Sequence, residues 1–188
     1  MWVQIYREAG YEEAARAARL SRGSVEKSDT LCDEVGDADM KLFTDLISRD
    51  KVDGYGDPHA VALRQIVFWL GVKAPLYWWK HMDRYTIGKD QASESTMYGL
   101  MKHPLTIGDF QSRIKPVLMW WLNRHIKRNH FSVVNAHLPI SYLQERSLMI
   151  SLPTMRRIIS QRTGHKLSEW TIFISEVLRQ ARYPNLLL

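Results

Sequence analysis

The sequence predicts an α+β protein that folds as one domain over residues 1–188. Several segments carry apolar side chains three and four residues apart, which is typical of helices. Residues 61–70 are instead rich in β-branched and aromatic side chains, which is typical of a strand. The 188 residues are 45% hydrophobic and 24% charged, a globular composition long enough to bury one core.

Two helices and a strand are expected in the N-terminal half. An Ala-rich helix covers residues 11–19, and a second helix over residues 39–48 places four apolar side chains on one face. The Gly and Pro residues of VDGYGDPH indicate a loop before the strand at 61–70. Both faces of this strand are apolar except at Arg64 and Gln65, so we expect it to be well covered.

A short helix and a long helical region are expected next. The run LYWWKHM after Pro75 predicts a helix that ends before Gly88. Residues 106–127 predict a longer helical region that either begins or kinks at Pro116. Thr106 and Asp109 have the spacing of a capping box.

The C-terminal part predicts one strand and two helices. A short strand is expected at residues 147–151 and a helix at 153–161, where Pro153 is tolerated in the first turn. A last helix follows, with Ser168 as its cap. Its apolar stripe is formed by Trp170, Phe173, Ile174, Val177 and Leu178.

The net charge of +6 is unevenly distributed along the chain. Residues 26–57 hold ten of the twenty acids and four of the twenty-six bases, so the basic surplus lies C-terminal to them. This surplus favours an anionic partner such as a phosphate, although a solvated helix face explains many of these bases equally well.

Nucleic-acid binding competes with this interpretation because tryptophans and bases are interleaved at Trp120, Trp121, Arg124, Lys127 and Arg128. The apolar residues around them recur at spacings of three and four. We therefore expect the aromatic side chains to form a buried helix stripe, with the bases outside, and expect no nucleic-acid partner.

Location and metal chemistry are constrained by what the sequence lacks. No apolar run approaches membrane-spanning length and no secretory signal pattern begins the chain, so we expect a cytoplasmic protein without a membrane partner. The single cysteine, Cys32, lies among acids, which favours an inert thiol. The histidines lack metal-site spacing, and a loop residue such as His59 is more often a surface residue than a ligand, so we expect no metal site.

Residues 59–98 resemble the core of the flavin-dependent thymidylate synthases. In that family a histidine-bearing strand leads through a Pro-containing turn into a helix and then the signature RHRxxSxNExSxRY. Here the strand reads RQIVFWL, the turn VKAP and the signature region DRYTIGKDQASESTMY. Further family-like segments are ARAARLSRGS, LPISYLQERSLM and MRRIISQRTGHKLSEW, in the family's order. The resemblance covers most of the chain and implies a central, mostly antiparallel sheet flanked by helices.

The resemblance also implies roles for individual residues. Arg84 matches the first Arg of RHR and would bind a flavin or nucleotide phosphate, for which a guanidinium is suited. Ser95 and Tyr98 match the signature serine and closing tyrosine, which makes them the catalytic candidates and Ser95 also a substrate contact. Lys80 and His81 occupy a pair that helps to hold the nucleotide.

Further site residues combine matches with departures from the family pattern. Arg162 parallels a late family arginine and would bind substrate, although it could equally complement a helix dipole. Gln65 and Tyr85 stand where the family has histidines, as polar groups available to a cofactor. Thr86, Met97 and Arg64 replace the signature's second Arg, its last Arg and the strand's Glu.

Such replacements are energetically important, because a lost hydrogen bond to a charged group typically costs about 1.5–3 kcal/mol. They could abolish ordinary flavin or deoxyuridylate binding. Alternatively, Gln65, Tyr85 and Glu94 could serve a changed ligand set. The counterpart of a downstream family arginine is Arg146 in one register and Pro153 in the other.

The implied function is C5 methylation of dUMP or a related pyrimidine deoxynucleotide, with methylenetetrahydrofolate as the carbon source. FAD would carry the hydride and NADPH would be the reductant. The family forms its active sites between subunits of a homotetramer, so we expect a homo-oligomer. The alternative is a catalytically inactive nucleotide-binding or assembly protein that has lost FAD, and a basic nucleic-acid-binding module ranks third.

Overall fold

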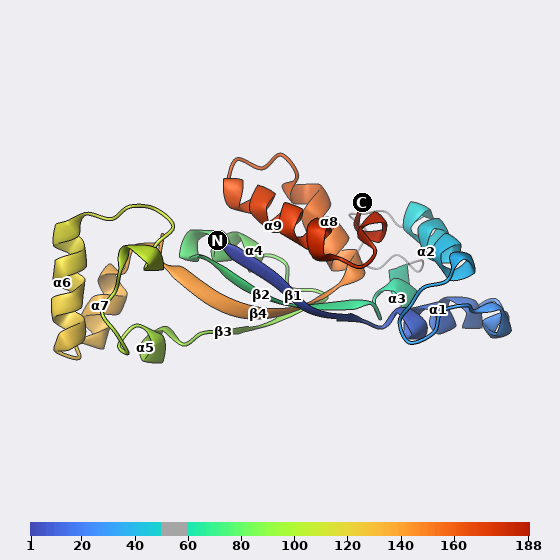
Figure 1. Cartoon of the computed structure of the whole chain (residues 1–188), viewed down its shortest axis with the longest axis horizontal. Helices are drawn as coiled ribbons and strands as arrows, with labels where there is room; N and C mark the ends of the chain where they lie inside the picture. The colour runs from blue at the N-terminus through green and yellow to red at the C-terminus, as the bar shows by residue number, and fades with distance from the viewer. Residues whose placement is uncertain (50–59) are drawn as a thin grey trace. The chain divides into compact units, whose positions relative to one another are not determined.

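The computed structural model describes residues 1–49 and 60–188, and Figure 1 shows the course of the chain. The described strands are β1 (Trp2–Ala9), β2 (Val67–Pro75), β3 (Lys89–Ser93) and β4 (Leu143–Ser151). The helices are α1 (Tyr11–Leu20), α2 (Asp37–Arg49), α3 (Ala60–Leu63), α4 (Leu76–Met82), α5 (Thr96–Gly99), α6 (Pro116–Lys127), α7 (Phe131–His137), α8 (Leu152–Arg162) and α9 (Ser168–Gln180). Single 3₁₀ turns lie at Val25–Lys27, Ile107–Asp109 and Pro184–Leu187.

The strands form a four-stranded antiparallel sheet in the order β1-β2-β4-β3. Backbone hydrogen bonds continue the pairing of β2 and β4 past both ends of the two strands: Leu152 donates to Ile66, and Leu76 donates to Tyr142. The predicted α+β class and the antiparallel sheet are therefore confirmed.

The chain divides into two compact units, and the segments of the two units alternate along the sequence. The first unit, here called the helical unit, contains Met1–Trp2, Val72–Arg84 and Gln91–Ser147. The second, here called the terminal unit, contains Val3–Gly71, Tyr85–Asp90 and Leu148–Leu188. Since neither unit is one continuous segment, the single domain over residues 1–188 remains a prediction, and each unit is described by itself.

The helical unit has its core among α5, α6, α7 and the segments that join them. Its buried apolar side chains are Leu100, Leu105, Phe110, Leu122, Ile126, Val134 and Tyr142. Phe110 and Tyr142 pack edge to face with ring centroids 5.9 Å apart, and Gln111 donates a backbone hydrogen bond to Ser141. These contacts hold the segment before α6 in place.

The first helix of the terminal unit, α1, has its first N–H groups capped by a residue that follows the helix in sequence. The carboxylate of Asp33 accepts hydrogen bonds from the backbone N–H groups of Tyr11 (2.7 Å) and Glu12 (3.1 Å), groups that have no partner within the helix. In the same unit, the C-terminal helix α8 buries Met155 and Ile158, and α9 buries Trp170, Phe173 and Val177, which belong to the predicted apolar stripe.

Most predicted elements are confirmed with shifted ends. The helix predicted at residues 11–19 is α1, that at 39–48 is α2, and the run after Pro75 is α4. The predicted strand at 147–151 is the second half of β4, and α8 contains the helix predicted at 153–161. The last helix is α9, where Ser168 is the first helical residue and Leu167 occupies the cap position.

The strand predicted at residues 61–70 is wrong in its first half. Residues Ala60–Leu63 form α3, and β2 begins only at Val67. A short apolar run fits a buried helical turn as well as a strand, and here Ala62 and Leu63 are buried within a turn. The loop predicted at VDGYGDPH and the interpretation of His59 lie outside the described residues.

The long helical region predicted at residues 106–127 is also corrected. A 3₁₀ turn at Ile107–Asp109 is followed by residues 110–115, which are not helical, and α6 begins at Pro116. The capping box is confirmed, since the Asp109 carboxylate accepts from the Thr106 backbone N–H (2.7 Å) and hydroxyl (2.9 Å). The buried aromatic stripe is wrong at Trp120, whose side chain is 59% exposed.

Two strands were not predicted. β1 at Trp2–Ala9 mixes exposed and buried positions without regular alternation. β3 at Lys89–Ser93 consists almost entirely of exposed polar residues, so neither strand has the apolar pattern on which strand prediction depends. Within the described part of the chain, no helix is both long enough and apolar enough to span a bilayer.

Candidate functional site

In the helical unit, the candidate residues Lys80, His81 and Arg84 are carried by α4 and the turn that follows it. Pro75 precedes the helix in an extended conformation. The buried side chains of Trp78 and Trp79 anchor its inner face, whereas Lys80 and Arg84 are exposed. Among the residues that the structure describes, no side chain pairs with Lys80 or Arg84, so both cations are available to an anion.

Trp79 links α4 to residues of strands β2 and β4. Its indole N–H lies 3.1 Å from the carbonyl oxygen of Ala74 and 3.0 Å from that of Gln144. The guanidinium of Arg146 lies over the same ring, 4.4 Å from its centroid, a distance at which a cation is attracted to the ring face.

Arg146 then connects three segments of the helical unit. Its Nη1 atom donates to Asp83 (2.9 Å) and its Nε atom to the side-chain oxygen of Gln144 (3.0 Å). Gln91 also donates to Asp83, at 2.9 Å. Because the Arg146 side chain is only 14% exposed, this planar group is held in one orientation by hydrogen bonds and by the Trp79 ring.

The same network reaches the catalytic candidates Ser95 and Tyr98. The Gln144 side-chain amide donates to the carbonyl oxygen of Glu94 (3.1 Å), and the Glu94 N–H donates to Glu145 (2.9 Å). Ser95 follows directly and precedes α5. Ser95 and Tyr98 are exposed, and Tyr98 is 67% exposed. Their backbone position is therefore held from β4 while both side chains face solvent.

The carboxylate of Glu94 also affects the pKa of the buried Tyr142 side chain. Burial, and after it the negative charges of Glu94 and Asp109, raises the pKa of Tyr142 to about 12. Tyr142 is 8% exposed. It therefore stays neutral at physiological pH and acts as part of the core of the helical unit.

In the terminal unit, the structure brings Tyr85 and Arg162 together. Arg162 Nε donates to the Tyr85 hydroxyl at 2.8 Å, and that hydroxyl donates to the side-chain oxygen of Gln161 at 3.1 Å. The guanidinium groups of Arg157 and Arg162 lie 5.5 and 5.4 Å from the Tyr85 ring centroid. Tyr85 is 3% exposed, so it is a packed anchor for α8 whose hydroxyl is already used.

Gln65 lies in the turn between α3 and β2, with its side chain exposed. Its carbonyl oxygen lies so close to Gly10, which has a φ of +93°, that a Cβ there would be 1.9 Å away. A small pocket of about 270 Å³ is lined by Arg64 and Thr86, which both differ from the family pattern, together with Lys89 and Ser151. Two of the positions at which the chain departs from the family pattern thus share one pocket.

Sequence reasoning missed several members of the helical-unit network, among them Asp83 and Gln144. Asp83 stands inside the signature region next to Arg84, and its charge was the available signal. Gln144 belongs to β4, which was predicted to begin only at residue 147. Within residues 1–49 and 60–188, no group of three or more His, Cys, Asp or Glu side chains could hold a metal ion, and Cys32 is exposed.

Comparison with solved structures shows which known fold this arrangement shares. The chain is similar to the flavin-dependent thymidylate synthase ThyX from Helicobacter pylori complexed with FAD and dUMP, with a TM-score of 0.76 and 16% identity over 100% of this chain and 98% of that one. A second structure of Helicobacter pylori ThyX with FAD and dUMP gives a TM-score of 0.75 and 16% identity over 99% and 96%.

No protein-family model and no curated protein matches the sequence. At 16% identity the structural similarity shows the fold. The resemblance inferred from the signature region is therefore confirmed as a resemblance of fold, across the whole length of the chain.

Proposed function

We propose that this chain binds dUMP or a related pyrimidine deoxynucleotide and carries out reductive C5 methylation of the type performed by flavin-dependent thymidylate synthases. The observation that supports this most strongly is the full-length similarity of fold to two ThyX structures that contain FAD and dUMP. We further propose that the protein acts as a homotetramer in the cytoplasm.

The exposed cations of α4 suit the phosphate of such a nucleotide. Lys80 lies in the last turn of α4, and Arg84, four residues further on, lies in the turn that follows the helix. The guanidinium of Arg84 can form two parallel hydrogen bonds with phosphate oxygens, whereas Lys80 supplies a compact point charge. His81 on the same helix would add a third contact.

The Arg146 network would position the signature segment rather than bind the ligand. Arg146 is already engaged by Asp83, Gln144 and the ring of Trp79. Through Gln144 it fixes the carbonyl of Glu94, and so the backbone that presents Ser95. In this proposal Ser95 and Tyr98 contact the nucleotide, while Arg146 determines where they are held.

The residues proposed for the flavin fit it unequally. Gln65 and Arg84 are exposed and can each donate to a flavin phosphate, whereas Tyr85 is buried with its hydroxyl bonded to Arg162 and Gln161. When bound, FAD would carry the hydride, with NADPH as reductant and methylenetetrahydrofolate as carbon donor. Arg162 would contact the nucleotide through guanidinium N–H groups other than the Nε–H it gives to Tyr85.

The engaged Tyr85 hydroxyl favours a second candidate function, namely a nucleotide-binding or assembly protein that has lost FAD. Titration of the purified protein with FAD, followed by visible absorbance with and without dUMP, distinguishes the two. Uptake of FAD with a spectral shift on adding dUMP supports the methyltransferase. Thermal stabilisation by dUMP without FAD uptake supports the second function, and the absence of both responses contradicts both.

A further inference from the structure

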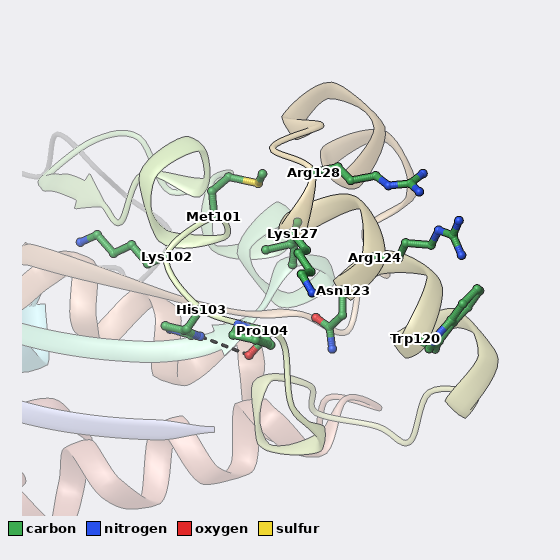
Figure 2. A pocket seen from close by; sticks show the side chains of 10 residues that line it. Met101, Lys102, His103, Pro104, Trp120, Asn123, Arg124, Lys127 and Arg128 are labelled. Carbon is green, nitrogen blue, oxygen red and sulfur yellow. Dashed lines mark hydrogen bonds between the residues drawn. The ribbon is translucent and has the colours of Figure 1, made fainter.

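A basic groove lies within the helical unit, and none of the residues assigned to the proposed nucleotide site lines it. Its volume is about 1040 Å³, and it runs between the Met101–Pro104 segment and α6 (Figure 2). Lys102 contributes one cation from the first wall, and Arg124, Lys127 and Arg128 contribute three from the second. None of the residues that line the groove is acidic, so its electrostatic potential favours an anion.

The α6 wall presents one face of a helix. Arg124, Lys127 and Arg128 follow Trp120 by four, seven and eight residues. Such spacings place Trp120, Arg124 and Lys127 on the same side of α6, and Arg128 is the cap residue at its end. At 1.5 Å per residue this face is about 12 Å long. Leu122, which is buried in the core, lies on the opposite face of α6.

Trp120 adds an exposed aromatic surface to this charged face. Its side chain is 59% exposed, and the guanidinium of Arg124 lies 5.4 Å from its ring centroid. Figure 2 shows Arg124 and Arg128 extending from α6 to the same side, with the Trp120 ring beside Arg124. An exposed indole next to cations provides a face on which a nucleic-acid base can stack beside its phosphate.

Two hydrogen bonds join α6 to Leu105, the residue that follows the Met101–Pro104 segment. The side-chain amide of Asn123 accepts from the Leu105 N–H at 2.7 Å and donates to the Leu105 carbonyl at 2.9 Å. The four groove cations form no ion pair with any residue in the described part of the chain. Their charges are therefore available to an external polyanion.

We propose that this groove binds single-stranded nucleic acid, with phosphates on Lys102, Arg124, Lys127 and Arg128 and a base stacked on Trp120. A single strand fits better than a duplex because stacking requires an exposed base face, which a duplex does not offer along its length. The proposal does not rest on the proposed enzymatic function. It reverses the sequence-based expectation of no nucleic-acid partner, since that expectation assumed buried aromatic side chains.

Fluorescence anisotropy with a labelled twelve-nucleotide oligothymidylate tests the proposal. We expect binding whose logarithmic salt dependence has a slope no steeper than about −2.8, because each phosphate neutralised on a single strand contributes about −0.7 and the groove has four cations. Arg124→Gln should reduce that slope by about 0.7. Arg113→Gln, at an exposed arginine that does not line the groove, should leave it unchanged.

The stacking contribution has its own variants. Trp120→Leu should weaken oligonucleotide binding at least about fivefold, the low end for one base stacked on an aromatic ring, and Trp120→Phe should restore most of it. Val117→Ala, at a 67% exposed position on the same helix, serves as the control. Excess dUMP should not displace the oligonucleotide from the groove. A protein that does not bind the oligonucleotide would therefore not contradict the proposed binding of dUMP.

Three results would overturn the proposal. One is the absence of oligonucleotide binding in low salt, and another is equal affinity for a duplex of the same length. The third is a Trp120→Leu protein that binds the oligonucleotide normally but sediments as a smaller species, because the groove would then be an interface between copies of this chain.

Discussion

Arg146 Nη1 lies 2.9 Å from the carboxylate of Asp83, with the arginine side chain 14% exposed and the aspartate 41% exposed. The pair joins β4 to the end of α4, immediately before Arg84. Because Arg146 also contacts Gln144 and the Trp79 ring, it is a buried structural centre rather than a surface charge. The counterpart of the downstream family arginine is Arg146 in one register and Pro153 in the other. The register at Arg146 places a guanidinium beside the signature region.

Replacing Arg146 should destabilise the protein far more than replacing a surface arginine. Arg146→Ala should lower the free energy of unfolding by about 2–3 kcal/mol, because hydrogen bonds to charged groups and a ring contact are lost together. Arg49→Ala breaks a half-exposed pair with Asp45 and should cost about 0.3–0.5 kcal/mol. Urea denaturation measures both, and equal losses would contradict a structural centre at Arg146.

Tyr85 and Arg162 should be energetically coupled. Tyr85→Phe should lower the free energy of unfolding by about 1.5 kcal/mol, because Arg162 and Gln161 lose their hydrogen bonds to the Tyr85 hydroxyl. A double-mutant cycle with Arg162→Ala should give a coupling energy of at least about 0.5 kcal/mol. If Tyr85→Phe left stability intact but abolished FAD uptake, Tyr85 would instead be a cofactor ligand.

Stability should fall in acid because of Asp39, whose side chain is fully buried beside Arg19. Burial alone would raise its pKa, but hydrogen bonds from Ser28, Thr30, Arg19 and the Asp29 N–H lower it from 3.8 to about 2. A carboxylate with a lowered pKa stabilises the folded state above its unfolded pKa, and that stabilisation is lost as protons bind.

The loss should fall between about pH 4 and pH 2 and amount to about 2 kcal/mol. Free energies of unfolding measured across this range check it. Asp39→Asn should remove this part of the pH dependence, and Ser28→Ala, which deletes one donor, should reduce it. An unchanged acid transition in Asp39→Asn would show that another group is responsible.

Gly88 should tolerate no side chain. Its φ is +69°, and a Cβ there would lie 2.4 Å from Thr154 Oγ1 and 2.5 Å from Ser151 Oγ. Gly88→Ala should therefore combine about 1–2 kcal/mol of backbone strain with about 1–3 kcal/mol of overpacking. Gly23 has a φ of +58° and open space around it, so Gly23→Ala should show the strain alone. Thermal unfolding of the two variants separates these effects.

The sequence predicted the elements whose apolar pattern is long and regular. Residues 11–20 and 168–180 bury one face of a helix, so their periodicity was sufficient. β3 is held by backbone pairing with β4 and exposes most of its side chains, which leaves no apolar pattern to detect. Residues 60–63 show the opposite problem, because an apolar turn and an apolar strand have the same composition.

The candidate site was predictable where it depends on matching residue types and not where it depends on contacts. Arg84, Ser95 and Tyr98 were proposed from the order of the signature, and their roles stay predictions. The engagement of Tyr85 by Arg162 joins residues 77 positions apart, and no local pattern indicates it. Trp120 was misplaced because a spacing of three or four defines a helix face without saying which neighbour covers it.

Binding of dUMP by calorimetry, compared between the wild-type protein and Arg84→Ala, tests the central proposal most directly. We expect measurable dUMP affinity that falls about 10-fold or more in Arg84→Ala, because a charge-assisted contact to the phosphate is lost. Arg113→Ala, at another exposed arginine of the helical unit, should bind dUMP normally. No binding to the wild-type protein, or equal affinity in Arg84→Ala, would contradict a nucleotide site at Arg84.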